Sequence, residues 1–145
     1  MKGIPKVTRV QLRDDNNDDQ IIFGLVSSDP DYKLSLALNR KLGLAMKSVS
    51  PITIAVETNK EESFSRFSDT SEAPDIVYTL VSNRCGSNFL IKKLRNVDFL
   101  LIARNEDTES MSGDIAARIK EIGSITAVFI VDLNTTRDKN LKYLI

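Results

Sequence analysis

Hydrophobic positions along the chain switch from the period of a strand to that of a helix and back again. Residues 20–28 hold a continuous apolar run, which is typical of a strand buried on both faces. Leucines at i, i+4 and i+8 follow within 34–42 and form one apolar stripe, which predicts a helix. Ser28-Asp29-Pro30 supplies an N-cap and a proline for its first turn, and Gly43 ends it. Residues 51–57 alternate apolar and polar, so they predict a strand with one face in solvent.

The same order of elements recurs in the C-terminal part of the chain. Residues 97–103 and 126–131 are apolar on both faces and predict two more buried strands. Between them, isoleucines at i, i+4 and i+7 within 115–122 predict a second helix, capped by Ser112 or Asp114. The chain therefore contains two predicted strand–helix–strand units.

Shorter segments complete the prediction. The strand expected at 6–13 should form a hairpin with 20–28 across the polar turn at 14–19. Additional strands are predicted at 63–69, 75–82 and 88–91, and a short helix or docked tail at 135–144.

These elements predict a single α+β domain over residues 1–145. We expect a mostly antiparallel sheet of about six strands, with two main helices packed mainly on one face. Two helices about 10 Å wide cover one face of such a sheet, whereas three of the strands are apolar on both faces. Self-association through the sheet would cover the second face, so the pattern favours a homodimer.

The amino-acid composition excludes several kinds of catalytic and metal-binding site. The 145 residues contain no histidine, no tryptophan and one cysteine, Cys85. The absence of histidine excludes Ser-His-Asp, Cys-His and His-containing metal sites within the chain. Lys+Arg and Asp+Glu both total 20, so no net charge attracts nucleic acid or an anionic membrane. We expect a cytoplasmic protein with no disulfide and no membrane span.

In the acidic stretch 14–19, Asp14, Asn16 and Asp18 fit positions 1, 3 and 5 of an EF-hand calcium loop, and Ile21 suits position 8. Asp19 stands where that loop needs glycine, and Leu25 stands where it needs a bidentate glutamate. A solvated hairpin turn is therefore the favoured interpretation, and no metal-binding residue is predicted.

Cys85 is the only candidate nucleophile. Arg84 beside it would lower the pKa of the thiol, and Gly86 would open a nest of backbone N–H groups for an anion. Glycine, serine and asparagine also suit an ordinary turn at this place, and that interpretation is favoured because no histidine activates the thiol. No catalytic residue is predicted.

Two other groups of charged residues have a functional and a structural interpretation. Lys92, Lys93 and Arg95, with Arg84 nearby in the sequence, could receive a phosphate or nucleic acid, but a solvated loop is favoured. Asp98 precedes a strongly apolar strand, where we expect it to cap the start of the strand and pair with Lys93 or Arg95.

Several short motifs resemble the IPExxxVDY family of small bacterial proteins. Ile91 matches the isoleucine of the signature, and Val97-Asp98-Phe99 matches its Val-Asp-Tyr, whereas Lys92-Lys93 replaces the Pro-Glu pair. The resemblance extends to three further segments, which are Asp31–Asn39, Ile76–Asn83 and Val131–Leu141. The family has no established activity, so the resemblance implies no catalytic or cofactor-binding residues. The loss of the Pro-Glu pair indicates that the signature marks a turn and the start of a strand.

The sequence therefore favours a non-enzymatic, self-associating interaction module. The alternative is a ferredoxin-like or ACT-like sensor that binds an amino acid or a nucleotide at a dimer interface. An enzyme working through carboxylates or Cys85 is the third hypothesis. The sequence predicts no cofactor and names no protein or small-molecule partner.

Overall fold

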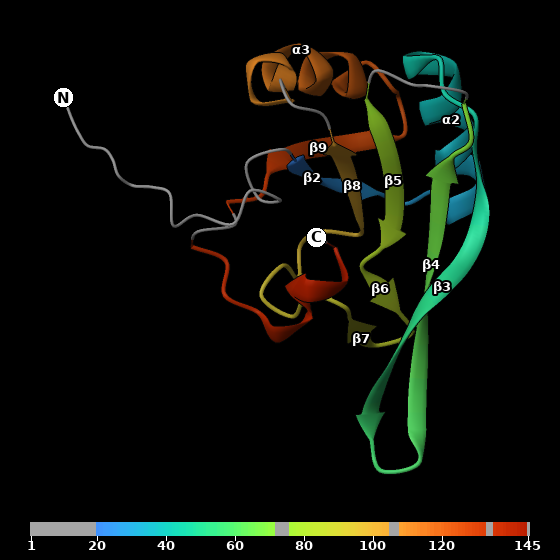
Figure 1. Cartoon of the computed structure of the whole chain (residues 1–145), viewed down its shortest axis with the longest axis vertical. Coiled ribbons are helices and arrows are strands. Elements are labelled where there is room, and N and C mark those ends of the chain that lie inside the picture. Colours follow the sequence, from blue (N-terminus) through green and yellow to red (C-terminus); the bar gives the residue numbers. More distant parts are fainter. Residues whose placement is uncertain (1–19, 72–75, 105–107, 133–134, 145) are drawn as a thin grey trace, which may run out of the picture.

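The computed structural model describes residues 20–71, 76–104, 108–132 and 135–144, which form one large sheet with two helices on one face (Figure 1). In chain order the elements are β2 (Gln20–Ser27), α2 (Asp31–Leu42), β3 (Met46–Glu57), β4 (Lys60–Asp69), β5 (Val77–Ser82), β6 (Arg84–Cys85), β7 (Asn88–Phe89), β8 (Phe99–Arg104), α3 (Thr108–Lys120), β9 (Ile125–Ile130) and the 3₁₀ helix η1 (Lys139–Tyr143).

The large sheet has six strands in the order β3-β4-β5-β8-β2-β9, and every neighbouring pair is antiparallel. The predicted α+β class is therefore confirmed. The two strand–helix–strand units are β2–α2–β3 and β8–α3–β9, and in each unit other strands lie between the two that the helix connects. Beyond the sheet, β3 and β4 continue as a long two-stranded hairpin (Figure 1).

The helix-covered face of the sheet holds the larger core. The apolar stripes of both helices pack on it, as their spacing predicts. This core is built around Phe23, Leu25, Leu34, Leu38, Leu80, Leu101, Ile115 and Ile119.

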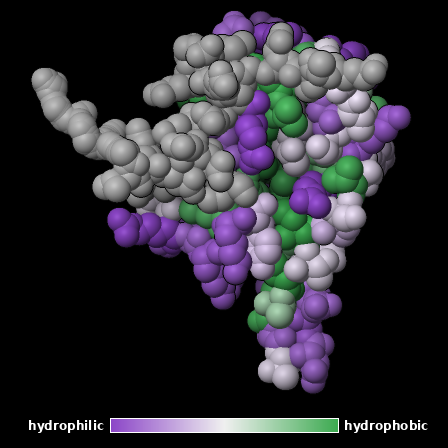
Figure 2. All heavy atoms as spheres, viewed as in Figure 1, coloured by the Kyte–Doolittle hydropathy of each residue, from purple (hydrophilic) through white to green (hydrophobic). Residues whose placement is uncertain are grey.

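The opposite face is covered by the chain itself. Leu90, Ile91 and Val97, from the segment between β7 and β8, are buried there together with Leu144. Figure 2 shows a band of hydrophobic side chains down the middle of the visible face, bordered by hydrophilic ones. The premise that a second copy must cover this face is therefore wrong. The packing was missed because two short segments, which carry little periodicity, supply the cover.

The helix boundaries differ from the prediction at their N-terminal ends. Pro30 occupies the N-cap of α2, and no side chain hydrogen-bonds there, so the cap predicted from Ser28 and Asp29 is wrong. The helix ends as expected at Gly43, whose φ of 69° is the left-handed conformation that glycine adopts readily. Helix α3 begins at Thr108, before the predicted caps.

The strand boundaries also differ in places. β3 begins at Met46 instead of residue 51, and the strand predicted at 88–91 is only the two-residue β7. The strand predicted at 6–13 and the turn at 14–19 lie outside the described residues. Over Phe23–Leu25, β2 is paired with β8 on one edge and β9 on the other, so no edge is left there for the predicted hairpin.

Candidate functional site

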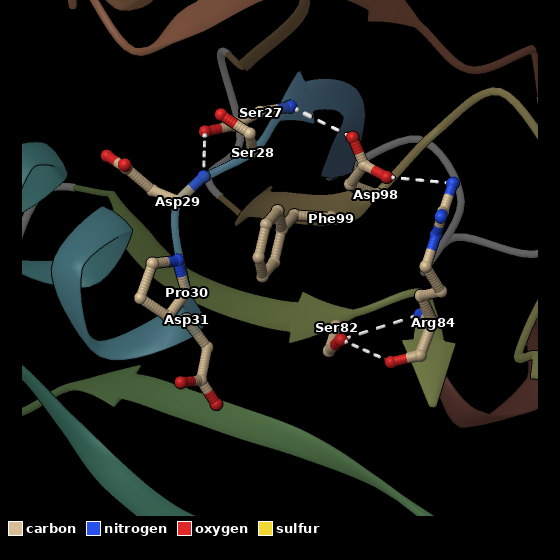
Figure 3. Close-up of a pocket in the computed structure, with 9 residues that line it drawn as sticks. All are labelled: Ser27, Ser28, Asp29, Pro30, Asp31, Ser82, Arg84, Asp98 and Phe99. Atoms are coloured by element: carbon tan, nitrogen blue, oxygen red, sulfur yellow. Dashed lines mark hydrogen bonds and ion pairs between the residues drawn. The ribbon is translucent and has the colours of Figure 1, made fainter. Parts of the chain in front are cut away.

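An open pocket of about 370 Å³ lies where three neighbouring strands meet the start of α2. β2 and β5 end there, and β8 begins there, since Phe99 lies near Leu25 on one side and Ser82 on the other. Figure 3 shows the residues around the pocket, which are Ser27, Ser28, Asp29, Pro30, Asp31, Ser82, Arg84, Asp98 and Phe99.

Asp98 connects two walls of this pocket. One carboxylate oxygen accepts a hydrogen bond from the Ser27 backbone N–H at 3.0 Å, and the other lies 3.0 Å from the Arg84 guanidinium (Figure 3). Its own N–H donates to the carbonyl of Leu25 at 2.9 Å. The predicted role of Asp98 at the start of the strand is confirmed, but its partner is Arg84. The pairing predicted with Lys93 or Arg95 is wrong, because the β6–β7 turn brings Arg84 closer.

Arg84 is held in place from several directions. Its guanidinium lies 5.1 Å from the centre of the Phe89 ring, a cation–π contact across the β6–β7 hairpin. The Ser82 hydroxyl donates to the Arg84 carbonyl at 2.8 Å. About half of the Arg84 side chain is still exposed, at 51%. The guanidinium is therefore positioned for a ligand and reachable by one.

The charges around the pocket select among ligands. Asp29, Asp31 and Asp98 supply three carboxylates against the single guanidinium of Arg84. The surplus negative charge opposes a phosphate and favours an ammonium group. Within the described ranges, no three residues of the types His, Cys, Asp and Glu gather closely enough to hold a metal ion. The lining of this pocket therefore suits a polar ligand that carries a positive charge.

Cys85 lies outside the pocket, and its environment is the opposite of that of a nucleophile. Its thiol donates a hydrogen bond to one carboxylate oxygen of Glu62 at 3.0 Å, while Asn88 donates to the other at 2.9 Å. The bond to Glu62 raises the pKa of the Cys85 thiol, and partial burial and the charge of Glu62 act in the same direction. The alternative that Arg84 lowers this pKa is therefore wrong, because Arg84 turns toward Asp98.

The basic residues next to this hairpin do not converge. Lys92, Lys93 and Arg95 are all exposed, on the segment whose apolar residues cover the second sheet face. Arg84, the fourth member of the predicted cluster, is paired with Asp98. Exposure of these three side chains agrees with a solvated loop.

Asn83 organises this region, and sequence analysis missed it. Its side chain is fully buried, and its amide donates to the carbonyls of Leu94 at 2.9 Å and Val97 at 3.0 Å. Its amide oxygen accepts from the Ile91 N–H at 2.8 Å. The buried Asn140 continues the network by donating to the Leu90 carbonyl at 2.7 Å. In the sequence, an asparagine after a predicted strand indicates only a turn. The role of Asn83 in holding the covering segment depends on hydrogen bonds to residues 8–14 positions away, which the sequence does not show.

The residues that carry the family resemblance meet in this network. Asn83, Ile91, Val97, Asp98 and Asn140 come from distant motifs and join the covering segment, β8 and the C-terminal turn.

A second candidate site is the free edge of the sheet at β9. Phe129 and Ile130 in this strand expose 44% and 56% of their surface. The strand is paired with β2 on one side, and none of the described strands pairs with its other side. Such an edge presents unpaired backbone N–H and C=O groups to any extended segment.

A scan against protein-family models finds no matching family, and a search of curated proteins finds no significant match. Neither described helix is long and apolar enough to cross a membrane.

Proposed function

We propose that the protein is a non-enzymatic interaction module that self-associates through the edge of its sheet. The observation that carries this proposal is the difference between the two edges. Natural sheets protect their edges with proline, charged side chains and irregular register, because an open edge recruits other strands. One edge of this sheet has all three features. The other edge, β9, has neither proline nor a charged side chain, and its register against β2 shifts once, at Thr126.

The protected edge is β3. Pro51 lies in the middle of this strand, where it removes a backbone donor, and Lys47 and Glu57 place charges along it. The register of β3 against β4 also shifts twice, after Val49 and after Ala55. These features disfavour pairing with a second sheet at this edge.

The open edge is β9. The run Ile125–Ile130 contains no proline, no glycine and no charged residue. It combines β-branched and aromatic side chains that favour extended structure. An edge of this composition is suited to strand addition, a common mode of protein recognition.

Two features of the described residues support a non-enzymatic role in the cytoplasm. The single thiol of the chain, Cys85, is held in its protonated form by Glu62, and no histidine is present to activate a hydroxyl. A single cysteine also agrees with a compartment in which disulfides are not used.

Native mass spectrometry of the protein purified gently from its own host tests the proposal. A mass of two chains, without added mass, is the expected result. A single-chain mass at high micromolar concentration would contradict it.

The second candidate function is small-ligand binding in the pocket around Arg84 and Asp98. Three carboxylates facing one guanidinium favour an amino acid or another amine over a nucleotide. A ligand at about 100 times its Kd should stabilise the fold by about 2.7 kcal/mol. A thermal-shift screen of amino acids and amines measures this, with Arg84→Ala as the matched variant. No stabilisation by any of these compounds, or the same stabilisation in Arg84→Ala, would exclude this pocket.

A further inference from the structure

The partner at the open edge can be specified further. Resting on the self-association proposed above, we infer that β9 pairs with β9 of a second copy, antiparallel, across a two-fold axis at Val128. The result is one continuous sheet of two chains. The argument depends on backbone direction, on register and on the helix above the strand.

The register with β2 shows which backbone groups of β9 face outward. The Val131 N–H donates to the Ile22 carbonyl at 2.8 Å, so these two residues form a hydrogen-bonded pair. Hydrogen-bonded pairs alternate along an antiparallel ladder, so Phe129 also bonds toward β2. The N–H and C=O groups of Val128 and Ile130 therefore point to the open side.

The faces of the sheet restrict the possible registers. A two-fold axis perpendicular to the sheet makes neighbouring strands antiparallel and keeps each face on its own side. Each residue must then lie opposite a residue of the same face, so the axis passes through a residue and not between two. The axis at Val128 pairs the outward groups of Val128 with those of Val128 in the second copy.

This register also places a small side chain opposite a large one. Phe129 lies opposite Ala127 of the second copy, within the part of β9 whose register against β2 is regular. An axis at Phe129 would place the two phenyl rings opposite each other and shorten the overlap of the strands. An axis at Ala127 would leave Ile130 beyond the paired region.

Helix α3 fits the same arrangement. It packs over both β2 and β9. With strands about 4.8 Å apart, the two copies of α3 come to lie about 10 Å apart, which is a normal distance for packed helices. Arg118 reaches toward α2, where it donates to the Lys41 carbonyl at 2.8 Å. At about 100° per residue, Gly113 and Ala116 lie on the side of α3 away from α2, and their small side chains allow the approach.

Disulfide trapping tests the register. Because Ala127 and Phe129 form a non-hydrogen-bonded pair in the inferred dimer, their Cα atoms lie about 4.5 Å apart, within disulfide range. Chains carrying Ala127→Cys are mixed with chains carrying Phe129→Cys, both with Cys85→Ser, and oxidised gently. Mass spectrometry should find the mixed disulfide at a yield several-fold above that of either chain alone.

The controls separate this inference from the proposed function. Phe129→Cys alone should cross-link poorly, because the two copies of residue 129 are diagonal neighbours in this register. A two-chain mass without preference for the mixed disulfide would overturn the pairing about an axis at Val128 and leave self-association standing. A single-chain mass would overturn both. Cross-linking that is strongest for Phe129→Cys alone would also overturn the axis at Val128.

A second pair of variants guards against misfolding of the cysteine chains. Ile130→Lys adds a charge to the open edge, and Leu36→Lys makes the same kind of change on the exposed surface of α2, where Leu36 is 53% exposed. We expect Ile130→Lys to raise the dimer Kd at least about tenfold, because edge lysines oppose strand addition, and Leu36→Lys to leave it unchanged. Equal effects of the two changes would contradict β9 pairing. If residues 1–19 or a different protein occupied the edge instead, neither change would alter a two-chain mass.

Discussion

Replacing Asn83 by alanine should destabilise the protein more than any other polar substitution in the described structure. The side chain is buried at 0% exposure and makes three hydrogen bonds of 2.8–3.0 Å to Ile91, Leu94 and Val97. The segment that it holds supplies Leu90, Ile91 and Val97 to the second core. Losing the amide therefore loosens the cover of a whole sheet face.

The expected magnitude follows from these three bonds. The substitution leaves the Val97 carbonyl and the Ile91 N–H unpaired in a buried place, each at a cost of about 1–3 kcal/mol, whereas the Leu94 carbonyl keeps its bond from the Val97 N–H. Water that enters the space of the lost amide recovers part of this cost. We expect the free energy of unfolding to fall by about 3–5 kcal/mol, and Tm to fall by about 10 °C.

Urea unfolding followed by circular dichroism measures the change, with Asn88→Ala as the matched control. The Asn88 amide donates to Glu62 near the surface, so its removal should cost less than about 1 kcal/mol. A loss below about 1 kcal/mol for Asn83→Ala, or equal losses for the two variants, would refute the argument that Asn83 organises the segment.

Three further changes test particular contacts. A Cβ on Gly24 would lie 3.0 Å from the Val97 side chain, so Gly24→Ala should cost about 1–3 kcal/mol in a urea titration, and Val97→Ala in the same chain should recover part of that loss. Because the bond to Glu62 raises the pKa of the Cys85 thiol, less thiolate is present at any given pH, and the stabilising contribution of this bond is lost as the pH rises through the raised pKa. Glu62→Ala should therefore speed iodoacetamide alkylation of Cys85 several-fold near neutral pH, and an unchanged rate would show that the bond does not control the thiol. Asp98→Ala should lower the free energy of unfolding by about 2 kcal/mol, because it leaves a backbone N–H of β2 and the guanidinium without their carboxylate, and a neutral effect would show that the contact is unimportant.

Helices and strands were predictable where their buried residues recur at a regular spacing in the sequence. The leucine stripe of α2 and the isoleucine stripe of α3 indicate which side of each helix faces the sheet. The continuous apolar runs of β2 and β8 likewise indicate that both faces of these strands are buried. Boundaries were less predictable, because α2 begins after Pro30 without a side-chain hydrogen bond at its N-cap.

The arrangement of these elements was not predictable from period alone. The cover of the second face depends on Asn83 and Asn140, whose partners lie far along the chain. The pair of Cys85 and Glu62 likewise joins residues separated by a whole strand, and it reversed the expected effect on the thiol. Such contacts leave no periodic signal, since each depends on how loops meet in space.

Hydrogen exchange along β9 is the most direct test of self-association at this edge. The amides of Val128 and Ile130 point to the open side, whereas those of Ala127 and Phe129 point toward β2 and serve as internal controls. If two copies pair through β9, exchange at Val128 and Ile130 is slow in concentrated protein and becomes faster on dilution, while the controls stay protected. Exchange at Val128 and Ile130 that is the same at both concentrations, whether fast or slow, would contradict the account.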